Sequence, residues 1–266
     1  MSPPLPSADR PADNDPGEIF VKICGITTEA DALLAVGMGA AAVGFVFAPS
    51  PRQMSPTAVG DIVKRLPREI VTVGVFRDEA PQRVIDIANH LGLRAVQLHG
   101  MESAEHTRWI AERVGLTIKA FPAGHPRIIN FSEYGAQLLM IDGASPGSGE
   151  LFDWRLAEGV VDPRRLIVSG GLRPENVGAA IAHLHPWGVD VCSGVEASPG
   201  VKDPIRLQQF IAAAHAAAEE VAISERAGMA PWITSDGQFD AAPGSAVPPG
   251  PGPAEESAAL FDWQSE

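Results

Sequence analysis

The feature that most constrains the fold is a series of short β-branched segments at nearly even spacing. They begin near residues 20, 41, 70, 94, 116, 137, 165 and 188, and they read FVKIC, AAVGFVF, IVTVGVF, RAVQLH, LTIKAF, QLLMID, LIVSG and VDVCSG. The mean spacing of about 24 residues leaves room for one helix after each strand. Eight such units predict an α/β fold of the closed (β/α)8 TIM barrel type, because an open doubly wound sheet rarely has eight even units.

The chain length agrees with a single barrel flanked by two tails. A chain of 266 residues can hold two average domains or one large α/β barrel, which commonly has about 250 residues, and the eight even units favour the barrel. We assign 18–218 to the catalytic barrel, 1–17 to a flexible N-terminal tail, and 219–266 to an acidic Pro/Gly-rich extension that is mostly disordered. Both tails contain too little apolar surface to compensate the entropy cost of ordering them.

Composition and charge exclude several classes of partner. The net charge of -13 disfavours nucleic acid and anionic membranes, since both require a basic surface. No apolar stretch is long enough to cross a bilayer, and the N-terminal segment lacks the apolar core of an export signal. Two cysteines, Cys24 and Cys192, are too few for a disulfide scaffold or a cysteine-rich zinc site. We therefore expect a cytoplasmic protein that binds neither nucleic acid nor membrane.

Two reactive side chains end strands of the predicted barrel. The carboxyl ends of barrel strands form the active face, and Cys24 ends the first strand while Asp142 ends the sixth. Strand alternation directs Cys24, Lys22 and Asp142 into the barrel. A lone strand cysteine is often only a small buried hydrophobe. An inward lysine two residues earlier favours the reactive interpretation, because its ammonium stabilises a thiolate.

Two glycine-rich turns predict a phosphate site. Gly170 and Gly171 follow the seventh strand, and Ser193 and Gly194 follow the eighth. Barrel enzymes frequently bind phosphate at these two positions through backbone N–H groups. One Gly-Gly pair alone often marks only a tight turn, but two turns after these particular strands indicate a phosphorylated small-molecule substrate.

Three further features lie at the predicted mouth of the barrel. Arg52 lies in the proline-rich loop FAPSPRQMSP, where its planar fork can bind a carboxylate or phosphate, or can simply be solvated. His99 has no second ligand at metal spacing, so we interpret it as a pocket-lining or structural residue and expect no metal. The glycine-rich segment 143–149 has the flexibility of a lid.

These motifs together resemble one known family, phosphoribosylanthranilate isomerase of tryptophan biosynthesis. The matching segments lie in order over residues 18–215, and they are KICGIT, GFVFAPSPR, VGVF, VQLHG, LMID, FDW, SGGLRPENV and SGVEASPGVKD. The resemblance implies an Amadori rearrangement of N-(5'-phosphoribosyl)anthranilate to 1-(2-carboxyphenylamino)-1-deoxyribulose 5-phosphate, without metal or cofactor. It assigns Cys24 as general base, Asp142 as general acid and Arg52 as the clamp on the anthranilate carboxylate.

Two other functions remain open from sequence. One is the histidine-pathway isomerase that performs the same rearrangement, although that family uses two aspartates where this chain has Cys24. The other is a non-catalytic barrel that only binds a phosphorylated ligand. The sequence allows a monomer or a homodimer. It also brings Cys192 near Cys24, since a closed barrel sets the last strand beside the first, and we hypothesise that the pair can oxidise to a disulfide.

Overall fold

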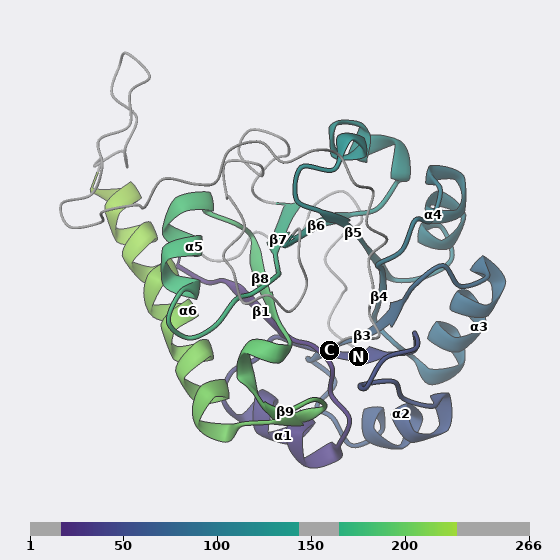
Figure 1. Ribbon diagram of the computed structural model, residues 1–266, viewed down its shortest axis with the longest axis horizontal. Helices are drawn as coiled ribbons and strands as arrows, with labels where there is room; N and C mark the ends of the chain where they lie inside the picture. The colour runs from purple at the N-terminus through teal and green to yellow at the C-terminus, as the bar shows by residue number, and fades with distance from the viewer. Residues whose placement is uncertain (1–16, 144–164, 228–266) are drawn as a thin grey trace, which may run out of the picture.

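The computed structural model describes residues 17–143 and 165–227, in which eight parallel strands form a closed barrel (Figure 1). The strands are β1 (Phe20–Ile23), β2 (Ala42–Val46), β3 (Val71–Phe76), β4 (Ala95–Leu98), β5 (Leu116–Pro122), β6 (Leu138–Asp142), β7 (Leu166–Val168) and β8 (Gly188–Val191). Each begins within one residue of its predicted start. The predicted barrel is therefore confirmed.

Each strand pairs with the next along the chain, and β8 closes the barrel against β1. In that last pairing Lys22 lies opposite Asp190 and Ile23 opposite Val191. The closure brings together residues that are far apart in sequence, with Lys22 and Asp190 separated by 168 positions. The carboxyl ends of β1 and β8 thus form one side of the barrel mouth.

Helices surround the barrel as an outer ring (Figure 1). They are α1 (Glu29–Gly37), α2 (Pro56–Val63), α3 (Pro81–Leu91), α4 (Ala104–Ala111), the 3-10 segment η1 (Pro126–Tyr134), α5 (Val177–Leu184) and α6 (Pro204–Arg226). Polar side chains cap several of them at the N-terminus: Thr28 accepts from the N–H of Asp31, and Ser55 from that of Ala58. Such caps satisfy backbone donors that would otherwise lack partners.

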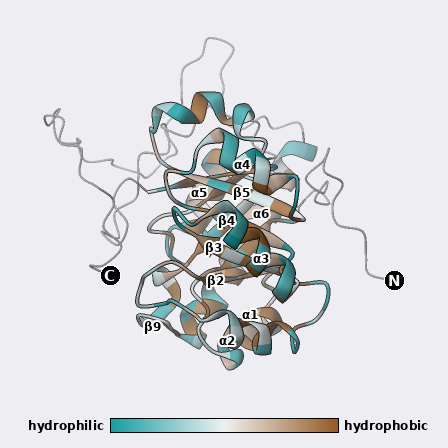
Figure 2. Cartoon of the chain, turned by 90° about the vertical axis from the view of Figure 1, so that its right-hand side faces the viewer, coloured by the Kyte–Doolittle hydropathy of each residue, from teal (hydrophilic) through white to brown (hydrophobic). Residues whose placement is uncertain are grey.

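Alternation along the strands divides the core into an outer and an inner part. Val21 and Ile23 pack between strands and helices, whereas Phe20 lies inside the barrel with Ile118 and Met140. Figure 2 shows the barrel from the side, with hydrophobic residues concentrated on the strands and hydrophilic residues along the surrounding helices. The pocket opens at the carboxyl ends of the strands, beyond this inner apolar cluster.

Some features extend beyond the predicted boundaries. Helix α6 continues to Arg226, past residue 218 where the sequence analysis ends the barrel. After β8 the chain forms a short 3-10 turn and a hairpin that were not predicted, η4 (Ser193–Val195), β9 (Glu196–Ser198) and β10 (Val201–Lys202). The predicted tails and lid fall largely outside the described residues. Over the described ranges, no helix is long and apolar enough to cross a membrane.

Candidate active site

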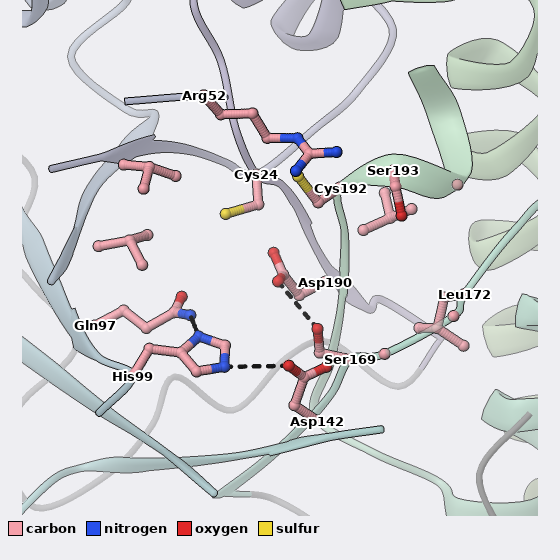
Figure 3. A pocket seen from close by; sticks show the side chains of 16 residues that line it. Cys24, Arg52, Gln97, His99, Asp142, Ser169, Leu172, Asp190, Cys192 and Ser193 are labelled. Carbon is pink, nitrogen blue, oxygen red and sulfur yellow. Dashed lines mark hydrogen bonds and ion pairs between the residues drawn. The ribbon is translucent and has the colours of Figure 1, made fainter. Parts of the chain in front are cut away.

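A pocket opens at the carboxyl ends of the barrel strands (Figure 3). All the site residues predicted from sequence line it: Cys24, Arg52, Asp142, Gly170, Gly171, Ser193 and Gly194. Five other polar residues line the same pocket and were not assigned catalytic or binding roles from sequence: Gln97, His99, Ser169, Asp190 and Cys192. The structure thus brings the predicted residues together, and it adds neighbours that act on them.

Cys24 lies at the end of β1, almost fully buried at 7 % exposure. Its backbone N–H donates to the Val191 carbonyl oxygen at 2.8 Å, and its side chain shares a small apolar cluster with Val46, Val75 and Cys192. A hydrogen bond with the Cys192 side chain, together with the Lys22 ammonium, lowers the pKa of Cys24 to about 6 against the opposing effect of burial. The thiolate therefore predominates at neutral pH.

Lys22 lies inside the barrel, as predicted, and it forms an ion pair with the carboxylate of Asp190. Its Nζ is 2.7 Å from Asp190 Oδ1, and Ser169 Oγ donates to Asp190 Oδ2 at 3.2 Å. Burial alone would lower the pKa of Lys22, but Asp190 and Cys24 raise it above its usual value. The ammonium is thus shared between carboxylate and thiolate. The sequence signal for Asp190 was an acid between two valines in VDVCSG, which the sequence analysis did not use.

Asp142 lies at the end of β6 with both carboxyl oxygens engaged. Oδ1 accepts from the backbone N–H of Gly143 at 3.0 Å, and Oδ2 is 3.1 Å from His99 Nε2. His99 Nδ1 is in turn 2.7 Å from Gln97 Nε2 (Figure 3). The sequence analysis interpreted His99 as pocket-lining or structural; it does line the pocket, and it also contacts the predicted acid.

Arg52 reaches the pocket from the loop after β2 and is held by an ion pair. Its Nε and Nη2 lie 2.9 and 2.7 Å from the Glu196 carboxylate, whose Oε1 also lies 2.9 Å from Lys202 Nζ. Burial would raise the pKa of Glu196, but Arg52 and Lys202 together lower it. The alternative interpretation of Arg52 as a solvated loop residue is wrong, because the residue is only 4 % exposed. Sequence reasoning missed Glu196 and Lys202, which lie in the unpredicted hairpin.

The glycine turns after β7 and β8 lie against each other. Gly170 has φ 85°, and a side-chain carbon there would collide with the backbone nitrogen of Gly143. A side-chain carbon at Gly194 would collide with the carbonyl oxygen of Leu172, so the two turns are in contact. Asn176 stabilises the first turn by donating to the Gly171 carbonyl at 2.9 Å. Exposed backbone N–H groups in such turns suit an anion.

The described residues contain no group of three or more His, Cys, Asp or Glu side chains arranged to hold a metal ion. Cys24 and Cys192 are both free thiols, and their oxidation to a disulfide stays a hypothesis. The chemistry that the pocket offers is acid–base catalysis beside a phosphate-binding end. Fold and pocket together define the class: a (β/α)8 barrel whose pocket, at the carboxyl ends of the strands, is lined by a buried thiol, a carboxyl group and two glycine-rich turns.

Comparisons with known proteins identify the family within this class. The family model described as N-(5'phosphoribosyl)anthranilate (PRA) isomerase matches residues 21–213. The N-(5'-phosphoribosyl)anthranilate isomerase of Desulforudis audaxviator (strain MP104C) is 48% identical over 199 residues, which are 72% of this chain and 96% of the relative. The chain therefore belongs to the phosphoribosylanthranilate isomerase family, whose enzymes act in tryptophan biosynthesis.

Solved structures agree with this assignment. A crystal structure of a phosphoribosyl anthranilate isomerase in complex with reduced 1-(o-carboxyphenylamino)-1-deoxyribulose 5-phosphate is 43% identical, with a TM-score of 0.67, and covers 75% of this chain and 100% of that one. A structure of monomers of the dimeric enzyme from Thermotoga maritima is 42% identical, with a TM-score of 0.65, over 74% and 98% of the two chains. The activity is thus that of a phosphoribosylanthranilate isomerase, and the family supports it over the two alternatives left open from sequence.

Proposed function

We propose that Cys24 and Asp142 carry out the Amadori rearrangement of N-(5'-phosphoribosyl)anthranilate as general base and general acid. Protonated Asp142 gives its proton to the furanose oxygen while the ring carbon–oxygen bond breaks, and the anthranilate nitrogen forms a protonated imine. This imine makes the hydrogen on the neighbouring sugar carbon acidic, and the Cys24 thiolate removes it. The resulting enolamine rearranges to the ketone, 1-(2-carboxyphenylamino)-1-deoxyribulose 5-phosphate.

The observation that carries this proposal is the placement of the two groups in one pocket. Cys24 comes from β1 and Asp142 from β6, and Figure 3 shows both side chains directed into the pocket that they line. The state of the thiol is also suited to its role. A thiolate with a pKa of about 6 is largely ionised at neutral pH and still basic enough to accept a proton.

His99 and Gln97 assist the acid in this proposal. With Gln97 Nε2 donating to His99 Nδ1, the imidazole hydrogen is on Nε2 and donates to Asp142 Oδ2. This arrangement stabilises the carboxylate that remains after Asp142 has given up its proton. His99 is a positioning residue, since it acts on the substrate only through Asp142.

The remaining predicted residues bind the two charged ends of the substrate. The guanidinium of Arg52 binds the anthranilate carboxylate while Glu196 holds it in place. The turns at Gly170 and Gly171 and at Ser193 and Gly194 bind the phosphate through backbone N–H groups. The support for this division is positional, because Arg52 enters the pocket from the loop after β2 whereas the turns follow β7 and β8.

The first prediction concerns Cys24→Ser and Asp142→Asn. We expect kcat/KM to fall by roughly 10²- to 10⁴-fold in each variant, because each loses one proton-transfer group. Turnover is followed by the loss of phosphoribosylanthranilate fluorescence. Circular dichroism and product-analogue binding confirm that the variants are folded with an intact pocket. An equally fast Cys24→Ser enzyme would assign the base to another residue, and an inactive wild type would remove the substrate assignment.

Partners and location belong to the same proposal. A small phosphorylated substrate is the expected partner, and the chain acts in the cytoplasm as a monomer or a homodimer. The relative from Thermotoga maritima is described as dimeric, which favours testing this chain by light scattering after size-exclusion chromatography.

The domain limits of 18–218 for the barrel, with tails at 1–17 and 219–266, stay a prediction and are tested by limited proteolysis.

A further inference from the structure

The two cysteines meet across the strand pair that closes the barrel. Ile23 of β1 lies opposite Val191 of β8, so the next residues, Cys24 and Cys192, also lie opposite each other. The hydrogen bond from the Cys24 N–H to the Val191 carbonyl at 2.8 Å continues the pairing beyond the last strand residue. Both side chains then pack in one apolar cluster (Figure 3).

The glycine after Cys24 leaves the space in which Cys192 lies. Gly25 has φ 69°, and a side-chain carbon at this position would come within 2.7 Å of Cys192 Sγ and of Arg52 Cδ. Any other residue at position 25 would therefore displace the Cys192 thiol. The backbone at Gly25 thus permits the thiol to lie next to the base.

We propose that Cys192 is a positioning residue for the general base: its thiol donates a hydrogen bond to the Cys24 thiolate and so keeps that thiolate ionised and oriented toward the substrate. This proposal rests on the proposed role of Cys24. Cys192 would act on the substrate only through Cys24, so it needs no contact with the reacting atoms.

The charges near Cys24 favour the thiolate on this sulfur. A side-chain carbon at Gly44 would lie 3.0 Å from Cys24 Sγ and 3.2 Å from Lys22 Nζ. The Lys22 ammonium and the Cys24 thiol therefore both lie beside Gly44. Asp190 opposes ionisation but is paired with Lys22 at 2.7 Å. These are the charged groups that act on Cys24 from β1 and β8.

Cys192 keeps its proton although two cations are near it. Arg52 and Lys202 favour its ionisation, but the neighbouring Cys24 and burial raise the pKa of Cys192 well above its usual value. Glu196 Oε1 also lies within hydrogen-bonding distance of the Cys192 thiol, 3.9 Å from Sγ. Its carboxylate already accepts from Arg52 and Lys202 at 2.7 to 3.1 Å. In this proposal the Cys192 hydrogen is directed to Cys24 instead, because Glu196 is already occupied by these stronger donors.

The test compares Cys192→Ser, which keeps a donor, with Cys192→Ala, which removes it. The chain has two cysteines, so in both variants the thiolate absorbance and the rate of alkylation by iodoacetamide report Cys24 alone. We expect the Cys24 pKa to be unchanged or lower in the serine variant, and higher by about one to two pH units in the alanine variant, as for loss of a hydrogen bond to a charged group.

Two further variants separate the loss of the donor from the loss of packing and fix which sulfur is ionised. Cys192→Val also lacks a donor but fills the space, and we expect it to behave like Cys192→Ala; a normal Cys24 pKa in the valine variant would overturn the proposal. Equal pKa values in the serine and alanine variants would overturn it as well. In Cys24→Ser only Cys192 remains, and titration of that thiol near pH 6 would reverse the roles of the two sulfurs.

Kinetics separate this proposal from the role of Cys24 as base. If Cys24 is the base, the acidic limb of the kcat/KM profile moves upward in Cys192→Ala by the same amount as the titration and stays in place in Cys192→Ser. A titration difference with no change in the pH profile would retain the hydrogen bond but reject Cys24 as the base. No titration difference, whatever the kinetics, rejects the hydrogen bond.

Discussion

At the scale of single residues, Cys24 and Asp142 each depend on neighbours that come from other strands. Cys24 is ionised at neutral pH because Cys192 and Lys22 outweigh its burial. Asp142 depends on His99, whose Nε2 lies 3.1 Å from the carboxyl group. Cys192 and His99 are both distant in sequence from the groups they contact, so the environment of each reactive group is produced by the barrel.

A prediction at this scale concerns His99. We expect His99→Ala to lower kcat by about 10- to 100-fold with little change in KM, because a hydrogen bond to a charged group is worth about 1.5–3 kcal/mol. His99→Gln keeps an amide N–H near the position of Nε2 and restores part of the rate. Steady-state kinetics on both variants check this. A drop confined to KM would place His99 in substrate binding instead.

At the scale of elements, the short hairpin after β8 sets the position of Arg52. Its strands β9 and β10 contribute Glu196 and Lys202, and together with Arg52 these form a buried cluster of two cations and one anion. Arg52 belongs to the loop after β2, and 144 residues separate it from Glu196. The hairpin therefore joins the beginning and the end of the barrel at the mouth of the pocket.

Glu196→Gln tests this connection. The substitution leaves Arg52 and Lys202 buried without their anion, which costs about 3–5 kcal/mol of folding free energy. We expect a lower melting temperature and a raised KM, because Arg52 is no longer held toward the substrate. Glu112→Gln is the matched control, since Glu112 pairs with Arg113 on the surface at 67 % exposure and should matter little. An unchanged KM in folded Glu196→Gln would show that Arg52 is positioned without Glu196.

At the scale of the whole molecule, another buried ion pair, between Lys119 and Glu102, stabilises the turn after β4. Lys119 Nζ donates to Glu102 Oε2 at 2.8 Å and to the Gly100 carbonyl at 2.7 Å, while Glu102 accepts from the N–H groups of Gly100 and Asp78. Burial would raise the pKa of Glu102, but Lys119 lowers it below its usual range. Burial lowers the pKa of Lys119, and Glu102 restores only part of it.

This pair predicts a loss of stability in acid. The folded pKa of Glu102 lies below the unfolded value of about 4.3, so its contribution is complete above that value and is lost as pH falls through the folded pKa. Glu102→Gln should lower the melting temperature at pH 7 by about 6 to 20 °C, and the difference from wild type should shrink in acid. Thermal melts from pH 7 to pH 3 measure both; a difference that is constant with pH would exclude this linkage.

Much of this architecture was predictable because it is local. β-branched runs and strand alternation indicated the eight strand positions to within one residue, and the inward side of β1. Sequence reasoning placed Cys24 and Asp142 at the pocket, because reactive residues at the ends of apolar strands have few structural reasons to be there. The glycine turns after β7 and β8 were found for a similar reason, since their conformations are properties of the turns themselves.

The sequence by itself determined the barrel, the end of the barrel at which the pocket opens, and several of the residues that line it. Only the tertiary structure decided their partners: Asp190 for Lys22, Cys192 for Cys24, His99 for Asp142 and Glu196 for Arg52. The physical reason is barrel closure. Propensity and alternation act over a few residues, whereas burial and charge depend on which distant strands become neighbours. The ionisation of Cys24 is therefore set across the pairing of β1 with β8.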